Sequence, residues 1–319
     1  MDISEQLNAT QATQDDVEPF LEVTAALVQK RRSQGRIIFD RFTRNRAAIG
    51  GAAFLVLLFL FCFLGPYVTG HSDPNLAHSL SLNDAINGGE RPSLTLPFGT
   101  DDVGRDYFAR TMVGGQTSLL VGLSSMFIAI LFGVGIGSFA GYYGGVLDNL
   151  LMRFTDIILA VPLYLLLFVL SASFTDGTPR SVILLIAAFG WTYTARLVRG
   201  EFLALKEREY VLAARTIGAR GFRMMFRHIL PNAAGPIIVS ATLLVGGNII
   251  VESVLSFFGF GIQPPIASWG SMIDTGQNLI DVNPLLVFIP GLLIFFTVLS
   301  FNLVGDGLRD ALDPYMTER

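Results

Sequence analysis

Six long apolar segments, separated by polar and charged ones, dominate the pattern of the chain. A helix that crosses the hydrocarbon core of a bilayer needs about 20 predominantly apolar residues. Largely apolar stretches of that length predict helices over 49–68, 118–142, 150–173, 181–203, 231–256 and 282–305. The pattern therefore predicts an all-α fold, that of a polytopic membrane protein with six transmembrane helices.

The basic residues fall mainly on one side of this predicted bundle. With the N-terminus placed in the cytoplasm, the cytoplasmic segments contain 18 of the 22 Lys and Arg residues, and the external segments contain 4. Cytoplasmic loops of membrane proteins carry such an excess of positive charge. We therefore expect both termini to lie inside the cell.

The composition supports a membrane location and offers few residues that could form a catalytic or metal site. Only 15% of the residues are charged, whereas soluble domains carry about 25%. Cys62 is the single cysteine, and His71, His78 and His228 are not clustered as metal ligands would be. The chain also lacks the Gly-x4-Gly-Lys-Ser/Thr loop that cradles nucleotide phosphates. We expect no catalytic residue, no metal site, no cofactor bound by this chain, and no nucleic-acid partner.

The chain divides into four predicted segments. Residues 1–46 form a cytoplasmic tail, 47–114 hold the first span and an external loop, 115–306 hold a five-helix core, and 307–319 form a second cytoplasmic tail. The first 29 residues contain acidic side chains but no Lys or Arg, and we expect part of them to be disordered.

Basic and apolar residues alternate over 35–46, just before the first span. The apolar members are Ile37, Ile38, Phe39 and Phe42. This alternation predicts an amphipathic helix that lies in the interface of the inner leaflet. A merely basic flank of the first span is the alternative.

The largest cytoplasmic loop, residues 204–232, carries the most informative pattern. A short helix that begins near residue 206 would have Glu207 and Glu209 in its first turn and Arg215 in its last, where their charges complement the helix dipole. Gly218 is placed to end this helix as the left-handed C′ residue. Four residues are expected on one face of it: Tyr210, Ala213, Ala214 and Ile217.

A second short helix is expected over 222–229, directly before Pro231 begins the fifth span. Its apolar side would be formed by Phe222, Met225, Phe226 and Ile229. The two helices together present a small, partly apolar surface that only a partner or the bundle itself can cover. The alanines permit close approach, which suits docking of this surface into a groove.

Small and polar residues inside the spans admit two interpretations each. Gly133, Gly137 and Gly141 recur every four residues, which favours close helix packing within the chain over a contact between subunits. Asn248 and Glu252 lie four apart on the fifth helix, and either line a transport pathway or take part in packing hydrogen bonds.

The third and fourth predicted helices carry charges near their cytoplasmic ends. We expect a local ion pair between Arg153 and Asp156, and a kink at Pro162. Arg196 and Arg199 are expected to extend toward the interface.

The cytoplasmic loop resembles the EAA loop of the permease subunits of binding-protein-dependent ABC importers. The matching residues are Ala213, Ala214, Gly218, Leu230 and Pro231. Leu212 stands where the general motif has Glu, and His228 stands where it usually has Ile. Residues 227–232 read Arg-His-Ile-Leu-Pro-Asn, which is similar to the peptide branch of that family.

Other segments resemble the C-type permease of oligopeptide and dipeptide importers. They are residues 44–48, 98–101, 141–145, 256–261, 263–265, 268–270 and 301–314. The resemblance extends over residues 36 to 314, and the run 301–314 is its most specific part.

The resemblance implies the transmembrane domain of a type I ABC importer in a bacterial inner membrane, with the loop coupled to an ATPase. The coupling residues that it implies are Glu209, Tyr210, Ala213, Ala214, Arg215, Gly218 and Pro231. The implied partners are a second homologous permease, two ATP-binding ATPase subunits, an extracytoplasmic peptide-binding protein and the lipid bilayer. ATP hydrolysis would then belong to the ATPases, and this chain would not be an enzyme.

Three alternatives remain at the level of the sequence. Related permeases handle nickel chelates or glutathione instead of other peptides. An ion-coupled secondary transporter is a different class, and the absence of an inverted repeat of interrupted helices speaks against it. A membrane scaffold would leave the docking loop unexplained.

The orientation can be tested by labelling single cysteines in a Cys62→Ser background. A cysteine at Asn87 should react with an impermeant maleimide added to sealed cells, whereas a cysteine at Arg220 should react only after the membrane is opened, because the positive charge of its loop holds it inside. Labelling at position 220 in sealed cells would reverse the topology.

Overall fold

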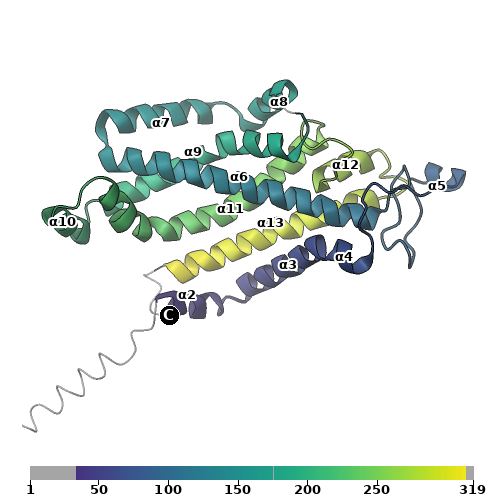
Figure 1. The fold of residues 1–319 in the computed structure, drawn as a ribbon, viewed down its shortest axis with the longest axis horizontal. Coiled ribbons are helices and arrows are strands. Elements are labelled where there is room, and N and C mark those ends of the chain that lie inside the picture. Colours follow the sequence, from purple (N-terminus) through teal and green to yellow (C-terminus); the bar gives the residue numbers. More distant parts are fainter. Residues whose placement is uncertain (1–33, 175, 314–319) are drawn as a thin grey trace, which may run out of the picture.

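The computed structural model describes residues 34–174 and 176–313, and these residues form a bundle of helices (Figure 1). The elements are α2 (Gln34–Phe42), α3 (Arg46–Phe63), α4 (Gly65–Thr69), α5 (Leu82–Ile86), α6 (Tyr107–Tyr143), α7 (Gly145–Ala160), α8 (Leu163–Phe174), α9 (Pro179–Leu205), α10 (Glu209–Thr216), a π-helical turn (Met224–Ile229), α11 (Leu230–Phe257), α12 (Trp269–Gln277) and α13 (Leu285–Leu312). Extended pairing in the described residues is limited to two isolated bridges, Ala77 with Arg105 and Thr100 with Asp106.

Five of the described helical stretches are long and apolar enough to cross a membrane. They are α3, α6, α9, the π-helical turn together with α11, and α13. The pair α7 and α8 makes a sixth if it is counted as one broken span. The all-α, polytopic fold predicted from the apolar pattern is thereby confirmed.

The third predicted helix is broken in the middle rather than gently kinked. Helix α7 begins at Gly145, ends at Ala160, and turns by 85° into α8. Val161 has an extended backbone (φ −86°, ψ 132°), as expected for a residue before proline, and Pro162 has no N–H to continue the ladder. The kink predicted at Pro162 is therefore found, but it separates two helices.

The long helices run alongside one another, with α10 at one end of the bundle and α5 at the other (Figure 1). We refer to these as the α10 end and the α5 end. One apolar cluster joins α3, α6, α11, α12 and α13, and contains Leu119, Ile249 and Trp269. A second cluster lies at the α10 end and ties α10 to α9 and α11.

Helices α6 and α9 touch through the predicted stripe of small residues. A Cβ added at Gly133 would lie 2.6 Å from Cβ of Thr194, one at Gly137 would lie 2.5 Å from the carbonyl oxygen of Ala195, and one at Gly141 would lie 2.6 Å from Cβ of Phe202. Each contact is with the same chain. The stripe therefore packs within this subunit, as the preferred interpretation of the spacing stated.

Ion pairs fasten α7 to α9 and correct the expected pairing. Arg199 binds Asp148 with two hydrogen bonds, from Nε at 2.5 Å and from Nη2 at 2.7 Å. Arg196 binds Asp156. The prediction that Asp156 pairs with Arg153 is wrong, because Arg196 of the neighbouring helix α9 lies closer to Asp156 than Arg153 of the same helix does.

The segment before the first span is helical, and its last turn packs on the end of α13. Nη1 of Arg41 donates to the carbonyl oxygen of Asp313 at 2.9 Å. The ring of Phe42 lies over Gly307, where an added Cβ would be 3.3 Å from it. Phe39 is exposed, so α2 has an uncovered apolar side. The expectation for residues 1–29 lies outside the described residues.

The contact of α6 with α9 can be tested with two alanine substitutions on the same helix. Gly137→Ala would force its Cβ against the backbone of α9, and should destabilise the fold by about 1–3 kcal/mol. Gly135→Ala is the control, because nothing lies within 4 Å of its added Cβ. Thermal unfolding in detergent measures both; equal melting temperatures would contradict the packing.

Candidate functional site

Helix α10 is short and is terminated by Gly218, which follows it. It contains 8 residues, and the Schellman arrangement of hydrogen bonds ends it: the N–H of Gly218 donates to Arg215 O at 3.1 Å and that of Ala219 to Ala214 O at 3.0 Å. Gly218 has φ +91°, in the left-handed region where a side chain is strained. The backbone expected at Gly218 is therefore present.

The start of α10 differs from expectation. The helix begins at Glu209, and Glu207 lies in the preceding turn, so Glu209 is its one acidic residue in the first turn. Arg215 lies in the last turn, as predicted. Both charges complement the dipole of the short helix.

The predicted apolar face of α10 is divided between two environments. Ala214 is only 6% exposed and packs with Val211 in the apolar cluster at the α10 end. Ala213 is exposed, Tyr210 is 42% exposed, and Ile217 is 85% exposed. The expectation that Ala214 shares a face with these three is wrong, because the bundle itself covers the Val211–Ala214 side of the helix.

The second predicted short helix is not a separate element. A π-helical turn, Met224–Ile229, continues directly into α11, and Pro231 stands in the first turn of that helix. The π-helical spacing places Met225 and Ile229 inside the bundle. Phe222 and Phe226 stack on one another at the exposed surface, with ring centroids 5.7 Å apart.

These exposed side chains, gathered at one end of the bundle, make up a candidate docking surface, which we call the α10 surface. Its apolar members are Tyr210, Leu212, Ala213, Ile217, Phe222 and Phe226. Partial burial raises the pKa of the Tyr210 hydroxyl, so this side chain stays neutral at physiological pH. An apolar surface on a rigidly closed helix, outside the spanning part of the bundle, is suited to bind another protein.

Glu252 is surrounded by serines in the interior of the chain. It is 0% exposed, and its carboxylate accepts hydrogen bonds from Ser256 Oγ at 2.7 Å and Ser118 Oγ at 2.9 Å. Ser118 Oγ in turn accepts from the N–H of Trp269 at 3.2 Å. This arrangement favours the packing role of Glu252, which joins α6 and α11 to the start of α12.

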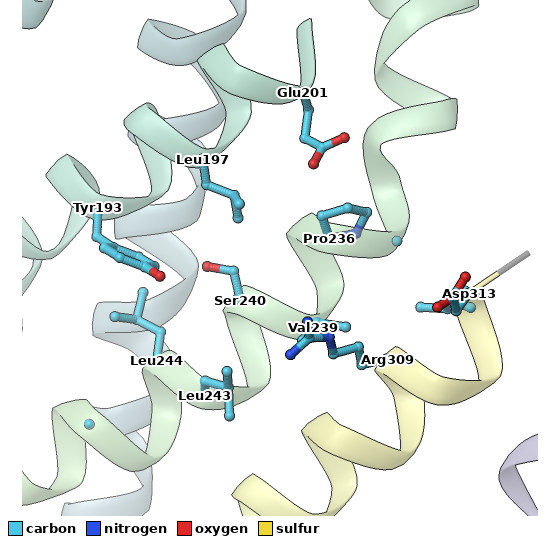
Figure 2. A pocket seen from close by; sticks show the side chains of 13 residues that line it. Tyr193, Leu197, Glu201, Pro236, Val239, Ser240, Leu243, Leu244, Arg309 and Asp313 are labelled. Atoms are coloured by element: carbon cyan, nitrogen blue, oxygen red, sulfur yellow. The ribbon is translucent and has the colours of Figure 1, made fainter. Parts of the chain in front are cut away.

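Asn248 lies one turn away in a different setting. Its Nδ2 donates to Gly122 O at 3.4 Å, and the residue lines a cavity of about 540 Å³ beside the break between α7 and α8. A larger cavity of about 830 Å³ lies nearer the α10 end, between α9, α11 and α13 (Figure 2). Thus the two residues proposed together for a pathway are separated, one at a cavity and one in the packed interior.

Several residues at these sites have no signal in the sequence. Tyr193, Ser240 and Arg309 come from three helices and meet only at the larger cavity (Figure 2). Ser118 meets Glu252 across 134 positions of the chain. Helical periodicity reports which face a residue occupies, but not which helix lies opposite.

The fold defines a multi-pass membrane protein with a candidate docking surface at one end. The chain belongs to the family described as binding-protein-dependent transport system inner membrane component, which matches residues 133–318. The N-terminal transmembrane domain of oligopeptide transport permease C matches residues 33–83. The chain is therefore a permease subunit of an ABC importer.

Relatives cover most of the chain. The oligopeptide transport system permease protein of Bacillus subtilis (strain 168) is 40% identical over 274 residues, which is 86% of this chain and 87% of the relative. The dipeptide transport system permease protein of the same strain is 40% identical over 275 residues, 86% and 83% of the two chains. A glutathione transport system permease protein of Pectobacterium atrosepticum is 38% identical over 283 residues, 89% and 92%.

The packing role of Glu252 leads to a stability prediction. Glu252→Gln replaces one of the two acceptor oxygens by a donor, so one of the short serine hydrogen bonds must be lost or reversed. The melting temperature of the purified protein should fall, by the equivalent of about 1–3 kcal/mol.

Ser253→Ala is the control for Glu252→Gln. Ser253 Oγ lies 3.5 Å from the Glu252 carboxylate, so its removal should change stability little. If Glu252→Gln leaves the melting temperature unchanged but alters transport by the assembled importer, the packing role is contradicted and a pathway-lining role of Glu252 is supported.

Proposed function

We propose that the chain is a permease subunit that carries short peptides into the cell, and that the α10 surface seats it on an ATPase. The exposure of the α10 surface carries this proposal. Ile217, Phe222 and Phe226 are large apolar residues at one end of the bundle, and they are 85%, 62% and 44% exposed. Large apolar side chains that gather at an exposed surface mark a site where a partner binds.

The docking surface is built to transmit force rather than to flex. The Gly218 turn is fixed by two backbone hydrogen bonds, and Ala214 anchors the opposite side of α10 in the bundle. A role in ATPase coupling is proposed for the exposed residues of this anchored helix: Glu209, Tyr210, Ala213 and Arg215. Gly218 is included because it ends α10, and Pro231 because it lies in the first turn of α11.

The orientation proposed here places the α10 end in the cytoplasm. The segments at this end contain most of the 22 Lys and Arg residues. In the proposed assembly a second homologous permease completes the pathway, two ATPase subunits bind at the cytoplasmic side, and an extracytoplasmic binding protein delivers the peptide. The chain itself binds no nucleotide or other cofactor in this arrangement.

The names of the relatives support peptides as the substrate class. Two of them are permeases for oligopeptides and dipeptides, and the third is a permease for glutathione, which is itself a short peptide. Neither nickel chelates nor an ion-coupled mechanism is favoured by these relatives or by the family match.

The proposal is tested by the same substitution at two neighbouring residues. Ala213→Asp places a charge on the exposed side of α10, and should cost about 2 kcal/mol or more in ATPase binding, or roughly thirtyfold, without lowering the melting temperature of the isolated permease. Ala214→Asp should instead destabilise the permease, because its charge enters the apolar cluster.

The readouts are co-purification of the ATPases, peptide transport in reconstituted vesicles, and the melting temperature of each permease variant. Normal transport and ATPase binding by Ala213→Asp would exclude the α10 surface as the docking element. Equal melting temperatures for the two variants would contradict the division of α10 into a buried and an exposed side.

A further inference from the structure

The two cavities of the bundle adjoin and form one hollow along α11. They share Tyr193, Leu244 and Gly247 in their linings. The lining residues on α11 extend from Gly235 to Val251, which at the rise of an α-helix is a length of about 24 Å. This length is most of the thickness of a bilayer core, so the hollow passes from the α10 end to the outer half of the span.

Polar groups without partners face this hollow. Figure 2 shows the hydroxyls of Tyr193 and Ser240 directed into the space between α9 and α11. Within the described residues neither hydroxyl makes a hydrogen bond. Asn248 uses one amide N–H on Gly122 O at 3.4 Å. The remaining lining of the hollow is mostly apolar, for example Leu197, Leu243 and Leu244.

The charges at the mouth of the hollow argue against contact with lipid. Glu201 from α9 and Arg309 from α13 both line the cavity at the α10 end (Figure 2). Ionised side chains near a membrane interior face water, a partner or one another because contact with hydrocarbon is costly. The mouth is therefore expected to be aqueous.

The broken helix marks the other part of the hollow. Val161 and Pro162, which separate α7 from α8, line the smaller cavity, and residues 159–165 are exposed. Non-helical backbone is tolerated at membrane depth only where protein covers it or where it borders a water-filled cavity.

The α5 end of the hollow is closed by α8. Leu167 is buried against Val182, Ile186 and Leu255. Phe168 packs on the rings of Phe258 and Phe260, with centroids 5.5 and 5.3 Å apart. The hollow is thus bounded at the α5 end and has its charged mouth at the α10 end.

We infer that this hollow is the chain's half of the translocation pathway, and that it holds an extended peptide by its backbone. The hydroxyls of Tyr193 and Ser240 and the amide of Asn248 pair with peptide N–H and C=O groups, while the apolar walls accept side chains of different kinds. Glu252, which is fully buried, lies outside this pathway. The inference rests on the proposed function and deepens it by naming the residues that the substrate meets.

The experiment uses single cysteines in the complete importer, reconstituted in vesicles from a Cys62→Ser parent. Ser240→Cys and Leu244→Cys should react with a charged methanethiosulfonate added on the α10 side, and the reaction should block peptide transport. Leu131→Cys is the control: it is exposed on α6 at a similar depth, but it does not line the hollow. It should not react with the charged reagent.

A second variant tests recognition of the backbone. Tyr193→Phe removes one hydroxyl and keeps the ring, so transport of two peptides of equal length but different side chains should fall by the same factor of about five, the effect of one hydrogen bond. ATPase binding and the melting temperature should not change. A loss confined to one of the two peptides would contradict recognition through the backbone.

The possible failures are distinguishable. If the importer with its native Cys62 transports no peptide, the proposed function fails. If the parent transports peptide but the two cysteines react only with a lipophilic maleimide, the hollow faces lipid. If they react with neither reagent, the second permease fills it. Either of the last two results would overturn the inference and leave the proposed function standing.

Discussion

Helix α6 meets α9 almost backbone to backbone, because Gly133, Gly137 and Gly141 leave no side chain between the two helices. This close approach fixes the position of α9, and α9 carries both candidate sites. Its last turn leads into α10, and its middle supplies Tyr193 to the hollow. In a membrane, where apolar side chains gain little by leaving lipid, such contacts are a main source of helix association.

The position of α9 also determines the ion pairs between α9 and α7. With α9 fixed, Arg196 and Arg199 point toward α7 and hold its acidic residues. These ion pairs, together with the stacking of Phe154 on Trp191, hold α7 beside α9 and so position the break that Pro162 causes. That break then borders the smaller cavity. The hollow is therefore a consequence of how α7 is held beside α9, as well as of the residues that line it.

The sequence predicted the features that depend on local properties. The transmembrane helices could be predicted from the length of the apolar segments, and the contact of α6 with α9 from glycines spaced four residues apart. The turn at Gly218 could be predicted because only glycine adopts its backbone conformation easily. It failed where a residue had several possible neighbours. Asp156 pairs with Arg196 rather than with Arg153, and Ala214 faces the bundle rather than a partner. The serines around Glu252 come from distant positions, which no periodicity connects.

The π-helical turn between the docking surface and α11 has a mechanical meaning. Its hydrogen bonds join residues five apart, as from the N–H of Leu230 to the carbonyl of Met225, and the helix continues without a loop to Phe257. Pro236 lies inside the first turns of this helix, between the π-helical turn and Ser240, and it has no N–H to continue the backbone ladder, so it marks the point where the helix bends. A tilt imposed on Phe226 at the surface is therefore passed along one continuous helix to Ser240, four turns away, with Pro236 between them as the point about which the two parts pivot.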